Sequence, residues 1–258
     1  MQLENKTIAV LVADEYEDLE VWYPLLRMQE EKAEVIVVAS DNMTEDSCFS
    51  KHGYEIEIDK KAAEVDADNF DAVIVPGGWA PDKLRRCQNT VNLVREMNQA
   101  GKVIAAICHG GWVLSSADIL DGKTVTSTEA IKDDLEHAGA DWIDQEVVID
   151  GNLITSRAPG DLPIFSRAII FALQEKVCVV CETEHEDNQE NAFYCVNCGT
   201  FYCPECAEEN DLRVHAHENL KRKKQEEKKQ LEKLEKTANI DEYKRNICPE
   251  CDYHLPQW

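Results

Sequence analysis

The 258-residue sequence predicts an α/β fold, in which a mostly parallel sheet lies between two layers of helices, followed by a small domain of another kind. Up to about residue 174, short apolar runs rich in β-branched residues alternate with amphipathic stretches. The runs are apolar on both faces, as expected of parallel strands covered by helices on each side. After Gln174 this alternation stops and Cys-x-x-Cys pairs appear. We therefore expect two domains, residues 1–174 and 175–258.

The first half of the large domain predicts three strands and one helix. Thr7–Val12 and Glu34–Ala39 are apolar runs of strand length, and the amphipathic stretch Asp18–Glu31 between them predicts a helix. Phe70–Pro76 is a further strand that ends at Gly77-Gly78. Ligands gather at the carboxyl ends of the strands in such sheets, so this glycine pair and the loop after Val12 are expected there.

The second half continues the alternation up to a final helix. The expected elements are a helix at Thr90–Ala100, strands at Val103–Ile107, Thr124–Ser127, Glu146–Ile149 and Leu153–Ser156, and a helix at Leu162–Gln174. The strand Val103–Ile107 stops at Cys108-His109, and two glycines then open what reads as a helix. This layout is typical of a nucleophile elbow, a sharp turn that lifts a reactive side chain above the sheet.

Cys108 is the candidate nucleophile of this elbow. A thiol at the start of a helix lies where the dipole favours negative charge, so we expect a lowered pKa for Cys108. His109 beside it is a candidate proton carrier. The alternative is an inert buried cysteine, the usual state of a free thiol.

Composition excludes several classes of function. The formal net charge is −24, so binding of nucleic acid through a broad basic surface is not expected. The N-terminus does not resemble a signal peptide, and no apolar run is long enough for a membrane span. We therefore expect a cytoplasmic protein, in which the eleven cysteines are thiols and metal ligands rather than disulfides.

Several segments of residues 6–174 together carry a family pattern. They are Asp14–Glu20, Lys51–Tyr54, Val75–Gly78, Ala106–Gly110, Ile131–Asp134, Glu146–Leu153 and Thr155–Pro163. In this order they resemble the PfpI family of the class I glutamine amidotransferase-like superfamily, which includes the Parkinsonism-associated deglycase and PfpI-type intracellular cysteine peptidases. The resemblance implies a flavodoxin-like, three-layer α/β/α sandwich and a cysteine-dependent enzyme that attacks carbonyl groups.

The resemblance also implies roles for single residues. Cys108 matches the nucleophile, and His109 matches the histidine that follows it. Glu20 matches the acid whose carboxyl lies against the sulfur, and Glu17 matches a second carboxylate of the site. An ionised Glu20 would raise the pKa of the thiol, so we expect Glu20 to act protonated, as a hydrogen-bond donor to sulfur.

Two further positions follow from the same resemblance. The backbone amides of Gly77 and Gly78, with that of His109, match an oxyanion hole. Asp82 matches an acid that peptidase-type members contribute from a neighbouring subunit to orient the histidine, which implies a homo-oligomer. The chain departs from many members at Gly111, where they have proline, and at Asp82, where some have glutamate.

The substrate stays open at this stage. The resemblance implies small reactive aldehydes such as methylglyoxal, the glycated adducts that they form, or peptides, with no cofactor for catalysis. The alternative is a stress protein without turnover, a redox sensor or chaperone that acts through the C-terminal domain.

The C-terminal domain carries four Cys-x-x-Cys pairs, which are typical of tetrahedral zinc sites. The expected ligands are Cys178, Cys181, Cys195, Cys198, Cys203, Cys206, Cys248 and Cys251. Four pairs complete two Cys₄ sites, so about two structural zinc ions are expected per chain. Redox dithiols or disulfides are the alternative.

The pairing of these ligands is open. The central segment resembles cross-brace zinc modules such as FYVE and B-box domains, in which the first and third pairs share one zinc. The second pair, Cys195 and Cys198, then takes either Cys248 and Cys251 or His215 and His217. A charged helix is expected at about residues 218–237. It would be a solvated spacer or, as the alternative, a docking site for a nucleic acid or an acidic partner. The protein partner of this domain is unknown.

Overall fold

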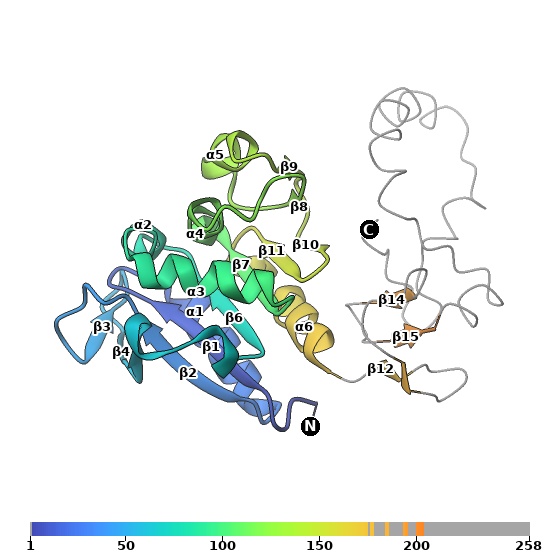
Figure 1. Cartoon of the computed structure of the whole chain (residues 1–258), viewed down its shortest axis with the longest axis horizontal. Coiled ribbons are helices and arrows are strands. Elements are labelled where there is room, and N and C mark those ends of the chain that lie inside the picture. Colours follow the sequence, from blue (N-terminus) through green and yellow to red (C-terminus); the bar gives the residue numbers. More distant parts are fainter. Residues whose placement is uncertain (1, 175, 178–183, 186–192, 196–199, 204–258) are drawn as a thin grey trace. The chain divides into compact units, whose positions relative to one another are not determined.

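The structure is a computed structural model that describes residues 2–174 and the short segments 176–177, 184–185, 193–195 and 200–203 (Figure 1). The chain divides into two units, residues 1–174 and 175–258, which are considered separately. Within these described segments, no helix has both the length and the apolar character that a membrane crossing requires.

A seven-stranded sheet in the order β10-β11-β7-β6-β1-β2-β5 forms the centre of the first unit. Its strands are β1 (Thr7–Val12), β2 (Glu34–Ala39), β5 (Lys60–Lys61), β6 (Ala72–Val75), β7 (Val103–Ile107), β10 (Val147–Asp150) and β11 (Leu153–Ser156). Only β10 and β11 pair in antiparallel orientation within this sheet. The mostly parallel sheet is thus confirmed, and β1, β2, β7 and β11 have the predicted bounds.

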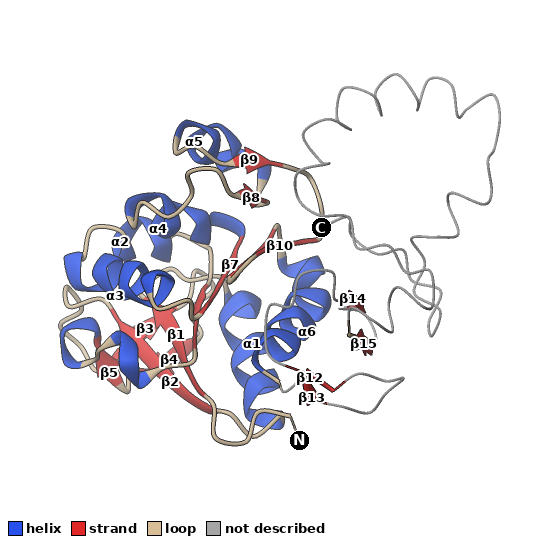
Figure 2. Cartoon of the chain, turned by 45° about the vertical axis from the view of Figure 1, so that its right-hand side comes forward, coloured by secondary structure: helices blue, strands red, loops and turns tan. Residues whose placement is uncertain are grey.

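Helices cover both faces of the sheet. On one face α1 (Asp18–Glu30) packs against α6 (Leu162–Leu173), and on the other lie α2 (Ala80–Leu84), α3 (Gln88–Gln99) and α4 (Gly111–Ser116) (Figure 2). All four residues of β6 are buried, because this strand lies inside the sheet with a helix layer on each side. These three layers form a flavodoxin-like α/β/α sandwich.

The sequence pattern missed the short elements. They include the edge strand β5, the hairpin of β3 (Ser47–Phe49) and β4 (Glu55–Glu57), helix α2, and α5 (Lys132–His137). The expected strand Thr124–Ser127 is shorter: β8 (Thr124–Val125) pairs only with β9 (Asp141–Trp142), outside the main sheet. Elements of two to six residues are too short to show a clear hydrophobic period.

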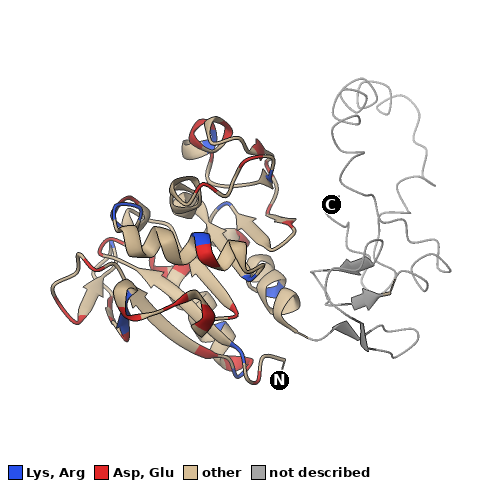
Figure 3. Cartoon of the chain, viewed as in Figure 1, with Lys and Arg blue, Asp and Glu red and all other residues tan. Residues whose placement is uncertain are grey.

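Charged residues of the first unit are interspersed. In the view of Figure 3, blue and red segments lie side by side on several elements of the first unit. In the sequence of α3, Arg95 directly precedes Glu96. Several of these neighbours form ion pairs, among them Arg27 with Glu31 and Arg157 with Asp161. In the described residues of this unit, basic side chains are thus partly neutralised by acidic neighbours.

The second unit is described only in four short strands and Cys203. Strand β12 (Lys176–Val177) pairs with β13 (Glu184–His185), and β14 (Phe193–Cys195) pairs with β15 (Thr200–Tyr202), both in antiparallel orientation. Cys203 is buried, and Cys195 is described only by its strand. The other expected zinc ligands lie outside the described residues, as do His215, His217 and the charged helix at about 218–237. The two zinc sites therefore stay a prediction.

Candidate active site

Cys108 occupies a strained turn at the carboxyl end of β7. Its φ is +59°, a left-handed conformation that is uncommon for a residue with a side chain. A single 3₁₀ turn, Cys108–Gly110, follows and leads into α4. A Cβ on Gly110 would lie 2.4 Å from the carbonyl oxygen of Val75, so the turn requires glycine there. The predicted elbow is confirmed in its backbone geometry.

The carboxyl group of Glu20 lies beside this turn. Glu20 is fully buried on α1, and its Oε2 accepts a 2.7 Å hydrogen bond from the backbone N–H of Gly77. A Cβ on Gly77 would lie 2.5 Å from this Oε2 and 2.8 Å from the Cβ of Cys108. The two side chains therefore converge on Gly77. Among the described residues, Glu20 Oε1 has no hydrogen-bond partner.

The pKa values of the two groups reflect this burial. Loss of water raises the pKa of Glu20 to about 7; the hydrogen bond from Gly77 opposes the rise and the charge of Glu17 adds to it. Loss of water also raises the pKa of Cys108 to about 12, with the charge of Glu20 as the second cause. Backbone N–H groups of His109 and Gly78 oppose this rise by donating to the sulfur.

The lowered pKa that the helix start predicts for Cys108 is thus wrong for the protein with ionised Glu20. The dipole of a 3₁₀ turn followed by a six-residue helix is outweighed by burial and by the neighbouring carboxylate. When Glu20 is protonated, the second of these two causes disappears.

His109 is placed to exchange a proton with the sulfur. Its Nδ1 lies 3.3 Å from Sγ of Cys108. Burial lowers the pKa of His109, and the charge of Lys51 lowers it further, which favours the neutral, proton-accepting ring. Trp79 and Trp112 flank this ring, with centroids at 5.9 and 5.1 Å. Trp79 is 57% exposed and therefore presents an aromatic surface beside the nucleophile.

The three amides expected to hold an oxyanion are not equivalent. The N–H of Gly77 is occupied by Glu20, whereas those of Gly78 and His109 donate toward the sulfur. Gly78 has a φ of +74°, and a Cβ there would lie 2.5 Å from both Glu15 O and Glu17 N. Of the three amides, those of Gly78 and His109 are therefore the two that point to the sulfur.

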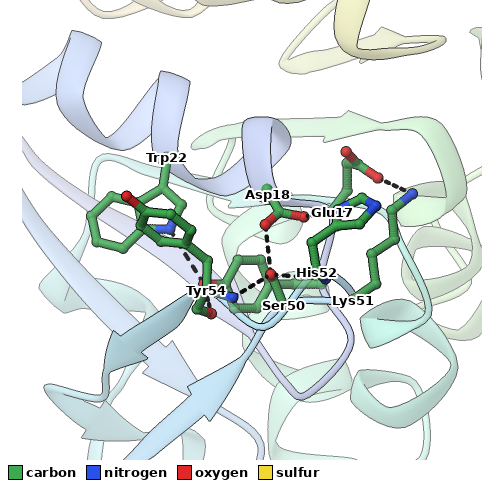
Figure 4. A network of polar contacts seen from close by, with 8 residues as sticks. Glu17, Asp18, Trp22, Ser50, Lys51, His52 and Tyr54 are labelled. Carbon is green, nitrogen blue, oxygen red and sulfur yellow. Dashed lines mark hydrogen bonds and ion pairs between the residues drawn. The ribbon is translucent and has the colours of Figure 1, made fainter.

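Glu17 and Asp82 have partners within the chain. Glu17 forms an ion pair with Lys51 (Figure 4), and its backbone N–H donates to Gly77 O at 3.3 Å. Asp82, on α2, has a side chain that is 52% exposed and pairs with Arg86. A contact of Asp82 with a second subunit stays a prediction.

Lys51 is the residue that the sequence did not single out. It lies within a matched segment, Lys51–Tyr54, but nothing local shows that its charge acts on His109 and on Glu20. The fold creates this relationship, because the loop that carries Lys51 lies beside the start of α1 (Figure 4).

Comparison with known proteins identifies the domain that carries these residues. The model of the DJ-1/PfpI family matches residues 6–172. A deglycase of Thermococcus kodakarensis is 44% identical over 167 residues, which cover 65% of this chain and 99% of that protein. A Bacillus subtilis protein described as a candidate cysteine protease is 42% identical over 163 residues, which cover 63% of this chain and 95% of that protein.

A solved structure shows the same domain in another context. The two-domain protein of Anabaena variabilis, which contains DJ-1/ThiJ/PfpI-like and ferritin-like domains, superposes with a TM-score of 0.62 at 44% identity. The match covers 64% of this chain and 47% of that one.

Proposed function

This chain belongs to the DJ-1/PfpI family, and we infer that its first unit is an enzyme in which Cys108 attacks the carbonyl groups of reactive aldehydes and of their glycated adducts. One observation carries the proposal: the strained elbow places Cys108 against both a buried acid, Glu20, and a neutral histidine, His109. The similarity to deglycases over the whole domain supports this substrate class.

The proposed chemistry is addition of a thiolate to a carbonyl. His109 Nδ1 takes the thiol proton, and the sulfur forms a C–S bond while the C=O π electrons move to oxygen. The N–H groups of Gly78 and His109 stabilise that oxygen. Protonated Glu20 donates from its otherwise unpartnered Oε1 to the sulfur. Return of the proton from His109 to oxygen gives a neutral hemithioacetal.

Methylglyoxal consumption by the full chain tests this proposal. Wild type is expected to consume the aldehyde, whereas Cys108→Ser is expected to lose at least about 100-fold in rate, because the alkoxide of serine is far less accessible than a thiolate. Cys87→Ser is a matched control, since this thiol lies at the start of α3 and donates to Asp41, a contact that a serine hydroxyl can also make. Equal rates for wild type and Cys108→Ser would refute the proposal that Cys108 is the nucleophile of an enzyme.

A peptidase activity is the second candidate, favoured by the similarity to the Bacillus subtilis protein. It needs Asp82 to reach His109 of another subunit, and therefore a homo-oligomer. Casein cleavage that is lost in both Cys108→Ser and Asp82→Asn, in a protein shown by light scattering to be oligomeric, would support it. Cleavage that persists in Asp82→Asn would exclude the intersubunit acid.

The alternative without turnover is a redox sensor or chaperone that acts through residues 175–258. It predicts that Cys108→Ser leaves protection of a heat-denatured client unchanged. Loss of that protection on removal of the zinc-site cysteines would assign the activity to the second unit.

We further propose two structural zinc sites in residues 175–258, supported by the four Cys-x-x-Cys pairs. Metal analysis of the full chain should find about two zinc ions per chain, released by mercurial titration of the thiols. Cys248→Ser with Cys251→Ser should lower this to about one if those residues are ligands. His215→Ala with His217→Ala should do so under the other pairing.

A further inference from the structure

Asp18 binds both residues that flank Lys51. Its Oδ1 accepts a 2.6 Å hydrogen bond from Ser50 Oγ, and its Oδ2 lies 2.7 Å from His52 Nδ1 (Figure 4). Burial opposes ionisation of Asp18, but the hydrogen bonds from Ser50 and His52 outweigh it and lower the pKa of this carboxyl. The carboxyl group of Asp18 is therefore ionised at neutral pH.

Ser50 connects Asp18 with further residues of the same loop. The residue is buried, and its Oγ accepts the backbone N–H of Tyr54 at 2.9 Å and that of His52 at 3.2 Å. One hydroxyl thus connects Asp18 with the turn that follows Lys51. The backbone on both sides of Lys51 is fixed by contacts that Lys51 itself does not make.

Lys51 is held against the chain segment that precedes α1. Its backbone N–H donates to Tyr16 O at 3.1 Å, and its ammonium group pairs with Glu17. On the opposite side, Tyr16 forms a β-bridge with Gly78. Segment 16–17 therefore separates the Lys51 loop from the glycine pair that lines Cys108.

The charges around Lys51 connect it with the reacting groups. The hydrogen bond that Lys51 donates to Glu17 is the main cause of its raised pKa, and the charges of Glu20 and Cys108 add to the rise. By reciprocity, the ammonium group favours negative charge on both. The same cation lowers the pKa of His109 after burial.

We propose that Asp18 is a positioning residue, which through Ser50 and His52 holds Lys51 where its ammonium group stabilises the negative charge on Cys108 during attack. This inference rests on the proposed nucleophilic role of Cys108. A stabilising acid at the start of α1 would act on the helix dipole alone. That role would not require the two short contacts with the loop.

The rate of Cys108 alkylation by iodoacetamide at pH 7 and at pH 9, followed on the Cys108 peptide by mass spectrometry, tests the proposal in the full chain. In Lys51→Met this rate is expected to fall roughly tenfold at both pH values, because less of the thiol is ionised. Asp18→Asn should lower the rate by less. Lys51→Arg should keep most of the wild-type rate, since it keeps the charge.

A double variant tests whether Asp18 acts by positioning Lys51 or only by stabilising the fold. If Asp18 acts through Lys51, Asp18→Asn combined with Lys51→Met lowers the alkylation rate no further than Lys51→Met alone. His52→Ala removes the contact of Asp18 with His52. Because the His52 side chain is exposed, this substitution should leave the fold intact. Glu30→Gln, a substitution at the other end of α1, is the control and should change nothing.

Losses of alkylation rate that multiply in the double variant would overturn the proposal, as would wild-type rates in both Asp18→Asn and His52→Ala. Failure of the proposed enzyme function has a different signature, methylglyoxal turnover that survives Cys108→Ser. The alkylation rates do not depend on that turnover, because they are measured on the thiol itself.

Discussion

The carboxyl of Glu20 faces the thiol of Cys108, and burial raises the pKa of both groups, to about 7 and to about 12. The charge of Glu20 adds to the rise at Cys108, so the site resists holding two negative charges at once. The pair therefore titrates as a unit, and the proton on Glu20 controls how readily the thiolate forms.

Glu20→Gln should lower the pKa of Cys108. The amide removes the second cause of the raised value, the carboxylate charge, while its oxygen still accepts the N–H of Gly77 and its NH₂ group donates to sulfur. Alkylation of Cys108 followed against pH should therefore show a midpoint below that of wild type. Glu96→Gln, on the exposed face of α3, should match wild type. A midpoint above that of wild type would assign Glu20 another role.

The same substitution should change how stability depends on pH. Glu20 has a folded-state pKa of about 7 against an ordinary value of 4.5, so the folded protein holds its proton more tightly than the unfolded chain. This contribution is fully present below pH 4.5 and is lost as pH rises through 7. Wild type should thus lose up to about 3 kcal/mol of unfolding free energy relative to Glu20→Gln between these limits. Urea titrations of both proteins at several pH values measure this difference, and a constant difference would contradict it.

The central strands could be predicted because they are buried on both faces. Thr7–Val12 and Val103–Ile107 read as uninterrupted apolar runs, and the structure gives them the predicted bounds. The hairpin β3–β4 carries alternate exposed and buried residues over only three positions per strand, which is too little to stand out from a loop. Yet this hairpin and the loop within it carry Lys51.

The site was predictable in its members but not in its connections. Cys108 and His109 are adjacent in the chain, so their contact follows from the motif. The hydrogen bond between Gly77 and Glu20 joins residues 57 positions apart, and it occupies an amide that the motif assigns to the oxyanion. Likewise the pKa of Cys108 depends on burial, which the fold creates, whereas the sequence shows only the helix start.

Trp79→Ala should weaken substrate binding without affecting the fold. The side chain is 57% exposed and lies beside His109, so its loss removes an aromatic surface next to the nucleophile. We expect KM for methylglyoxal-modified peptides to rise several-fold, and the free energy of unfolding to change by less than about 0.5 kcal/mol. Steady-state kinetics and urea titration measure the two quantities. An unchanged KM would show that substrate does not contact this indole.

Trp112→Ala should lower the free energy of unfolding and leave KM nearly unchanged, the reverse of Trp79→Ala. The Nε1 of Trp112 donates to Asp134 Oδ2 at 2.7 Å, and Arg85 lies over its ring at 5.8 Å. The indole therefore joins α4 to α2 and α5, and its loss should cost about 1–3 kcal/mol of stability. Comparison of the two variants distinguishes the aromatic surface that faces substrate from the one that supports the site.

Gly78→Ala should disable the site far more than an alanine at another left-handed glycine. Both Gly78 and Gly101 have positive φ, +74° and +69°, so alanine costs about 1 kcal/mol of backbone strain at either position. At Gly101 the new Cβ meets nothing within 4 Å. At Gly78 it would lie 2.5 Å from Glu15 O and Glu17 N, so the backbone must move, at a further cost of about 1–3 kcal/mol. That movement displaces the amide that faces Cys108, and with it the segment that Lys51 contacts. Gly101→Ala should therefore keep wild-type kcat for methylglyoxal, whereas Gly78→Ala should lose 10-fold or more, about 1.4 kcal/mol. Equal stability and equal kcat in the two variants would mean that the Gly78 amide has no part in catalysis.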